Sequence, residues 1–230
     1  MTDATTRSAA GTRLALKLLI GAGLMVVAAS IFGVIADQVT DAADLTRFDD
    51  ALARWLHAHM GSGVTTLMVR ASAVHSTLAV SAYVVAFAVA LAVKRNWYRL
   101  QMLVAVVPVG MLLNVVLKQA FHRTRPSFED MAHQLTTYSF PSGHTMAATV
   151  LWGFIVTWAW PYVKGWQVRA LLVLLASIAV FLVGFSRIYL GAHFLSDVLA
   201  AMCEGVAWTA LCVVAFDTWQ RHRALRPQRS

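Results

Sequence analysis

The stretch SRIYLGAHFLSD (residues 186–197) decides how the chain folds, because it joins two long apolar segments and carries charged side chains between them. His193 and Asp197 are four residues apart, a spacing that places two side chains on one face of a helix. A carboxylate in that position can hold an imidazole ring for nucleophilic attack. The stretch therefore predicts a His–Asp pair on a helix that starts near His193.

The chain as a whole is far more apolar than a soluble domain of its length needs to be. Hydrophobic residues make up 59% and charged residues 13% of the 230 positions, and the mean hydropathy is +0.64. A net charge of +8 would suggest a nucleic-acid partner for a soluble protein, but here the basic residues gather at the ends of apolar segments. We therefore predict an integral membrane protein whose partner is the lipid bilayer and not a nucleic acid.

Six apolar segments are expected to be transmembrane helices. They run over residues 14–36, 64–93, 100–117, 143–160, 170–185 and 193–216. Between the first two, residues 37–63 carry five aspartates and apolar side chains at helical spacing, which predicts an amphipathic helix on the bilayer surface. The predicted fold class is an all-α membrane protein, a six-transmembrane-helix bundle with an amphipathic interfacial helix between spans 1 and 2.

Six spans place both termini on the same side of the membrane. The loops around Lys94 and Lys164 are short and basic, whereas residues 37–63 are net acidic, so the positive-inside rule predicts cytoplasmic termini. Residues 1–13 are expected to be a disordered cytoplasmic tail and residues 217–230 a basic cytoplasmic tail. The ends of the spans that carry the remaining polar stretches then face outward.

Three polar stretches reach this outer surface. They are KQAFHRTRP (residues 118–126), PSGH (residues 141–144) and SRIYLGAHFLSD (residues 186–197). If they meet, they place three cations (Lys118, Arg125, Arg187), two histidines (His144, His193), the Asp197 carboxylate and a helix N-terminus around one small volume. That set of groups suits a tetrahedral phosphate and requires neither a metal nor another cofactor.

The residue types in these stretches match the charge of a phosphate group. Lys118, Arg125 and Arg187 are placed to neutralise it, and the arginines can bind it bidentately. Ser142 and Gly143 lie where the fourth span begins, so their backbone N–H groups and the helix dipole are expected to form an anion site, with the Ser142 hydroxyl as a further donor.

The order and spacing of these residues resemble the three-part signature of the type 2 phosphatidic acid phosphatase (PAP2) superfamily, in its bacterial integral-membrane lipid phosphatase branch. The matching residues are Lys118 with Arg125-Pro126, then Pro141-Ser142-Gly143-His144, then Ser186-Arg187 with His193 and Asp197. The resemblance covers about residues 45–216. It implies one transmembrane catalytic domain over residues 14–216.

The resemblance also implies a role for each signature residue. His193 would attack phosphorus to form a phosphohistidine, while Asp197 fixes the tautomer of His193 and stabilises the imidazolium. His144 would protonate the leaving oxygen and later activate water. The phosphate-binding residues would be Lys118, Arg125, Ser142, Gly143 and Arg187. Arg123 could contact a second phosphate or the lipid headgroup, or it could be a solvated loop residue.

Each motif also has a purely structural interpretation. Lys118 and Arg125 could anchor a loop among the lipid headgroups, and PSGH could be only a turn and a helix cap. His193 and Asp197 could be a structural pair. An ionisable side chain within an apolar helix is costly, however, so Asp197 favours the catalytic interpretation.

Two further polar residues are expected in the apolar segments. Glu204 follows Asp197 by seven residues and should lie near the same helix face, paired with Arg70 or another buried donor. His75 could line the site or satisfy a neighbouring backbone group. We expect a structural role for Glu204.

The resemblance implies a metal-independent hydrolase that removes a phosphate or pyrophosphate from a lipid at the periplasmic face of a bacterial inner membrane. Phosphatidylglycerol phosphate and undecaprenyl pyrophosphate are the leading substrates, with phosphatidic acid as a third, and the motifs do not rank lipid tails. One alternative is a phosphotransferase that passes the group to an acceptor lipid such as lipid A. A second is a non-enzymatic carrier of lipid phosphates. The sequence specifies no oligomeric state.

Overall fold

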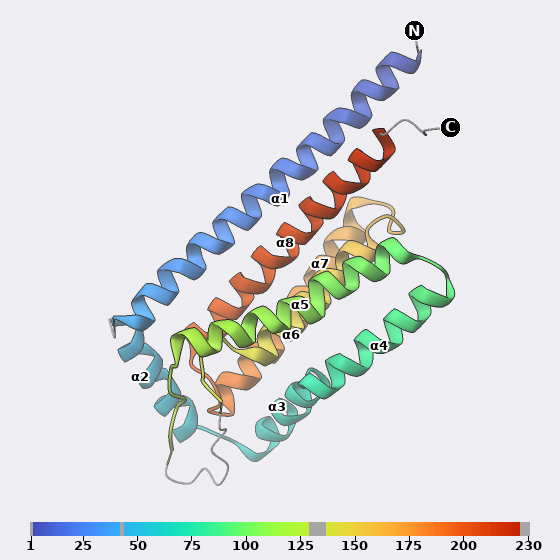
Figure 1. Ribbon diagram of the computed structural model, residues 1–230. Coiled ribbons are helices and arrows are strands. Elements are labelled where there is room, and N and C mark those ends of the chain that lie inside the picture. Colours follow the sequence, from blue (N-terminus) through green and yellow to red (C-terminus); the bar gives the residue numbers. More distant parts are fainter. Residues whose placement is uncertain (1, 42–43, 129–136, 226–230) are drawn as a thin grey trace.

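The computed structural model describes residues 2–41, 44–128 and 137–225, and each regular element in these ranges is an α-helix. The helices are α1 (Thr2–Thr40), α2 (Asp44–Ala58), α3 (Ser62–Val74), α4 (Thr77–Val93), α5 (Trp97–Phe121), α6 (Gly143–Ala159), α7 (Trp166–Tyr189) and α8 (Leu195–Leu225). Most of the long helices run roughly alongside one another, and both termini lie at the same end of the bundle (Figure 1). The predicted all-α class is confirmed.

Helix α6 is the centre of the bundle, where α4, α5, α7 and α8 all contact it. Its buried side chains include Ala147, Val150 and Phe154, which belong to the main hydrophobic core. Close packing depends on small residues, as is typical of membrane helices. A Cβ atom on Gly205 of α8 would lie 2.7 Å from Thr149 of α6, so only glycine lets these two helices approach this closely.

Helices α1 and α8 lie side by side along much of their length (Figure 1). Residues 2–13 are helical and continue α1, whereas the sequence predicts a disordered tail there. This segment contains no proline, and extending an existing helix costs far less than starting one. At the other end, α8 continues to Leu225, into the predicted basic tail, and residues 226–230 of that tail lie outside the described residues.

The predicted second span, residues 64–93, is not one helix. It is divided into α3 and α4, whose axes differ by 41° at a break between them. Ser76 lies at the break and is the N-cap of α4, because its side chain accepts a hydrogen bond from the backbone N–H of Ala79 at 3.3 Å. His75 lies at the break and accepts a hydrogen bond from Trp152 Nε1 of α6 at 3.1 Å.

Four of the described helices, α1, α5, α7 and α8, are each long and apolar enough to cross a membrane, and the bent pair α3–α4 would make a fifth span. Helix α6 has 17 residues, slightly fewer than the roughly 20 that a bilayer requires. The six-span count therefore stays a prediction. The helix predicted within residues 37–63 is present as α2, which buries Ala53 and Leu56 and exposes Phe48 and Trp55. Its position on the bilayer surface also stays a prediction.

Candidate active site

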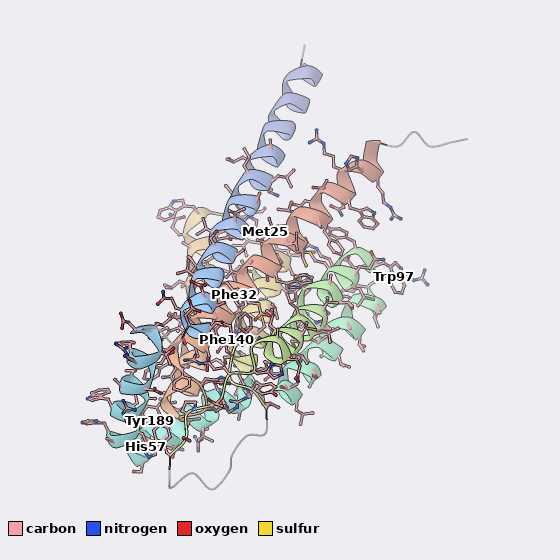
Figure 2. All side chains as sticks on the ribbon, turned by 60° about the vertical axis from the view of Figure 1, so that its left-hand side comes forward. Met25, Phe32, His57, Trp97, Phe140 and Tyr189 are labelled. Carbon is pink, nitrogen blue, oxygen red and sulfur yellow. The ribbon has the colours of Figure 1, made fainter. Side chains whose placement is uncertain are left out.

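The three polar stretches meet at the end of the bundle that is opposite the two termini (Figure 1). Helix α5 ends there and α6 begins, and the connection from α7 to α8 lies beside them. Helix α2 packs against α7 and α8 at this end. Figure 2 shows His57 of α2 and Tyr189 of α7 close to this end, and Trp97, the first residue of α5, far from it.

His193 and Asp197 form the predicted pair, with Nδ1 of the ring 3.3 Å from Oδ2 of the carboxylate. They do not share a helix face, because α8 begins at Leu195 and His193 precedes it. The reason is local: the backbone N–H of Phe194 donates to Asp197 Oδ2 at 2.9 Å, so the carboxylate caps its own helix. Asp197 accordingly lies in the first turn of α8 and not deep within an apolar helix.

The His193 ring is buried next to the Asp197 carboxylate. Only 2% of the residue is exposed, and burial lowers the pKa of His193 from 6.5 to about 3. Because Nδ1 faces the Asp197 carboxylate, the proton of the neutral ring belongs on Nδ1 and the free electron pair on Nε2. Arg125 Nη1 lies 3.1 Å from that Nε2 atom. The Nε2 atom of His193 therefore faces a guanidinium cation that can donate a hydrogen bond to it.

The side chains of Lys118 and Arg125 both bind residues 137–139, which precede PSGH. Lys118 Nζ donates to the backbone oxygens of Tyr138 and Ser139, at 2.9 and 3.2 Å. Arg125 donates to the backbone oxygens of Thr137, Tyr138 and Ala192 at 2.6–3.2 Å. A bound phosphate would have to take over some of these donors from the carbonyl groups.

Ser142 is the N-cap of α6, as predicted, but its backbone N–H donates to the Asp197 backbone oxygen at 3.0 Å. That N–H group is therefore not available to an anion, which corrects the prediction for Ser142 and leaves only its hydroxyl. Gly143 lies beside Lys118, since a Cβ on Gly143 would be 3.6 Å from Lys118 Cε. The N–H groups of the first helical turn have no partner within the helix, so those from Gly143 onward are the candidate donors.

Arg187 and His144 complete the set of signature residues. Arg187, in the last turn of α7, donates from Nη1 to the Ser72 hydroxyl of α3 at 2.6 Å. Its Nε atom is buried and has no hydrogen-bond partner among the described residues. His144 is the second residue of α6 and directly follows Gly143, which lies beside Lys118. All the signature residues are therefore gathered at one end of the bundle.

Arg123 is neither a solvated residue nor a free phosphate ligand. Its side chain is 10% exposed and forms ion pairs with Asp197 at 2.6 Å and with Asp49 at 2.9 Å. Asp49 was not predicted as a site residue from the sequence. Neither was Ser139, whose buried hydroxyl donates to Asp197 Oδ2 and lies 3.4 Å from His193 Nδ1. Ser139 precedes PSGH by two residues, but nothing in its sequence context marks it.

Glu204 is paired with Asn114 of α5, whose Nδ2 atom donates to Oε2 at 2.8 Å. The alternative partner, Arg70, is exposed on α3. Because Glu204 binds an amide on the neighbouring helix, this contact joins α5 to α8 below the site, which agrees with a structural role.

A pocket of about 650 Å³ opens between α2 and the loop that follows α5. It is lined by Asp50, Ala53, Arg54, His57, Thr124, Arg125, Pro126, Ser127, Phe128 and Phe194. Arg125 belongs to both the pocket and the site, and Phe194 directly follows His193. The pocket therefore adjoins the candidate site through Arg125 and Phe194.

Comparison with known proteins finds the same family by sequence and by structure. A family model described as the PAP2 superfamily matches residues 98–221. Phosphatidylglycerophosphatase B of Bacillus subtilis (strain 168) is 35% identical over 116 residues, which are 49% of this chain and 55% of that protein. The chain thus matches about half the length of this curated relative.

Two solved structures share the fold. The transmembrane PAP2 type phosphatidylglycerolphosphate phosphatase from Bacillus subtilis has a TM-score of 0.69 and 24% identity, covering 89% of this chain and 98% of that one. Aquifex aeolicus LpxE has a TM-score of 0.52 and 21% identity, covering 71% and 93% of the two chains. At these identities, the likeness concerns the fold alone.

Proposed function

Because the chain belongs to the PAP2 superfamily, we propose that it is a membrane phosphatase that hydrolyses a lipid phosphate through a phosphohistidine at His193. Nε2 of His193 attacks phosphorus, the bond from phosphorus to the lipid oxygen breaks, and His144 gives that oxygen a proton. Water, deprotonated by His144, then attacks the phosphohistidine. The products are the dephosphorylated lipid, inorganic phosphate and free His193.

The observation that carries this proposal is the orientation of the His193 ring. Its Nδ1 lies 3.3 Å from the Asp197 carboxylate and its Nε2 lies 3.1 Å from the Arg125 guanidinium. The carboxylate stabilises positive charge on the ring during attack, and the guanidinium stabilises negative charge on the phosphoryl oxygens. A histidine with only a packing role requires neither the tautomer nor the cation.

The cations of the site match the charge that develops on the transferring group. Lys118 and Arg125 both donate to the backbone oxygen of Tyr138, so one phosphate that took over these donors could meet both cations. Arg187 offers an unpaired buried Nε atom. We propose that these residues bind the phosphoryl oxygens together with the Ser142 hydroxyl and the Gly143 N–H.

We further propose phosphatidylglycerol phosphate as the preferred substrate, ahead of undecaprenyl pyrophosphate and phosphatidic acid. The name of the Bacillus subtilis relative, phosphatidylglycerophosphatase B, favours it. So does the pocket beside Arg125, because Arg54 on its wall offers a cation to the second phosphate of that headgroup. Phosphatidic acid has no second phosphate, and in undecaprenyl pyrophosphate the two phosphates are directly joined.

The test is phosphate release by the purified protein in detergent, with each of the three lipids in mixed micelles and EDTA present. We expect kcat/KM for phosphatidylglycerol phosphate to exceed that for phosphatidic acid by about 10- to 100-fold, since a charge-assisted contact contributes about 1.5–3 kcal/mol. Arg54→Ala should remove most of this preference, while Arg47→Ala, an exposed change on the same helix, should keep it. EDTA should not change the rates.

The alternatives give different results in the same assay. Transfer of labelled phosphate to an added acceptor lipid, without release of free phosphate, would show that the enzyme is a phosphotransferase and not a hydrolase. Movement of the lipid headgroup across vesicles that survives His193→Ala would indicate a carrier. Equal kcat/KM for all three lipids would overturn the substrate assignment and leave the phosphatase proposal intact.

We propose that the catalytic domain, residues 14–216, crosses a bacterial inner membrane six times, with α3–α4 and the short α6 as the second and fourth spans. The site lies at the end of the bundle opposite the two termini (Figure 1), so cytoplasmic termini, as the positive-inside rule predicts, would leave the site facing outward. In a background without Cys203 and Cys212, Ser62→Cys should react with a membrane-impermeant maleimide added outside intact cells. Lys94→Cys should react only after permeabilisation, and the opposite pattern would invert the topology.

A further inference from the structure

Arg123 joins two buried carboxylates that lie 148 residues apart in the sequence. Its Nη1 atom donates to Asp197 Oδ1 at 2.6 Å, and its Nη2 atom donates to Asp49 Oδ2 at 2.9 Å. Both carboxylate side chains are fully buried, and the guanidinium lies 4.3 Å from the centre of the Phe194 ring. Such a site holds a guanidinium in one orientation, because its N–H groups bind the two carboxylates and its planar face lies over the Phe194 ring.

Asp49 also binds the first turn of α8. The backbone N–H of Ser196 donates to Asp49 Oδ1 at 3.0 Å, and the Ser196 hydroxyl bonds the other carboxylate oxygen. Arg123 Nη1 donates to the same hydroxyl at 2.7 Å. Helix α2 is therefore fastened, through one carboxylate, to the helical turn that carries Asp197.

These contacts decide which oxygen of Asp197 faces His193. Arg123 occupies Oδ1, whereas Oδ2 receives the Phe194 N–H and the Ser139 hydroxyl and lies 3.3 Å from His193 Nδ1. With Oδ1 fixed, the carboxylate plane is fixed, and so is the rotation of the imidazole ring. Asp49 balances the charge of Arg123, so the three groups together carry one net negative charge next to the ring.

We propose that Asp49 and Arg123 are positioning residues for catalysis, acting on His193 through Asp197 and not on the substrate. This inference rests on the proposed function. It assigns α2 a part in the chemistry beyond any membrane contact. It also predicts that Arg123 contributes to kcat and not to phosphate binding, because its donors to Asp49, Asp197 and Ser196 leave it committed to protein partners.

The first test compares Asp49→Asn, Arg123→Lys and Arg123→Gln in the full-length protein, with phosphatidylglycerol phosphate in mixed micelles. We expect kcat to fall by about 10- to 100-fold in each, the size seen when a partner that orients a functional histidine is lost. KM should change by less than about threefold. The matched control is Asp44→Asn, which removes an exposed carboxylate from the same helix and should leave kcat unchanged.

A second measurement separates positioning from folding. Labelled phosphoenzyme, trapped by rapid alkaline quench, gives the number of active sites from its amplitude and the rate of attack from its time course. We expect the rate to fall by the same factor as kcat while the amplitude per folded molecule is kept. The double variant Asp49→Asn/Arg123→Gln should be no slower than the slower single variant, since both residues act through one carboxylate.

Several results would overturn the inference. A raised KM with unchanged kcat would make Arg123 a substrate ligand, and an unchanged trapping rate in folded Asp49→Asn protein would leave Asp49 a purely structural role. Additive losses in the double variant would mean that the two residues act separately. If the wild type forms no phosphoenzyme, or if His193→Ala still forms it, the proposed function fails first, so the two failures are distinguishable.

Discussion

Replacing His193 with alanine is expected to reduce phosphate release by at least about 10⁴-fold and to abolish the trapped phosphoenzyme, because the variant lacks the atom that bonds to phosphorus. The loss should appear in kcat, since the cations that bind the phosphate remain. The measurement is a steady-state assay with phosphatidylglycerol phosphate, joined to rapid-quench trapping. A KM within a few-fold of the wild-type value would show that binding survives.

The matched control for this variant is His59→Ala. His59 is exposed at the end of α2, where its ring stacks on Trp55, and it lies outside the candidate site. Its replacement should change kcat by less than about twofold, as is usual for a surface change away from special features. Substantial hydrolysis by His193→Ala, together with a labelled histidine at another position, would show that the nucleophile is not His193.

The features that could be predicted from the sequence are those that depend on local patterns. Apolar runs located most of the long helices, and the small, polar PSGH segment located the start of α6. The His193 and Asp197 side chains meet as expected, although by a different route, because a capping carboxylate starts α8 two residues after His193. Spacing alone does not distinguish these two geometries, since both bring residues i and i+4 together.

The features that could not be predicted depend on contacts between distant segments. Asp49 is one of five aspartates in residues 37–63, and only its place on the apolar face of α2, with Ala53 and Leu56, could have set it apart. Its partners, Arg123 and Ser196, are 74 and 147 residues away. The break between α3 and α4 could not be predicted either. Ser76 caps α4, but serine also occurs inside membrane helices, so its presence does not identify a helix start.

Replacing Asp197 with asparagine is expected to lower kcat by about 10³- to 10⁴-fold, the scale on which a catalytic histidine loses activity when it is held in the wrong tautomer. Both carboxylate oxygens accept hydrogen bonds, Oδ1 from Arg123 and Oδ2 from Phe194. An amide keeps only one acceptor. If its oxygen stays with Arg123, its NH₂ group faces His193 Nδ1, moves the ring proton to Nε2 and removes the electron pair that attacks phosphorus.

Glu204→Gln is the matched control for Asp197→Asn, because it makes the same chemical change on the same helix seven residues later. Glu204 is also buried, but its partner is Asn114, and its contacts do not reach His193. We expect this variant to keep kcat within a few-fold while Asp197→Asn loses it at an unchanged KM. Equal losses in the two variants would mean that both buried carboxylates on α8 act only through folding. The orientation of His193 by Asp197 would then not support a catalytic role.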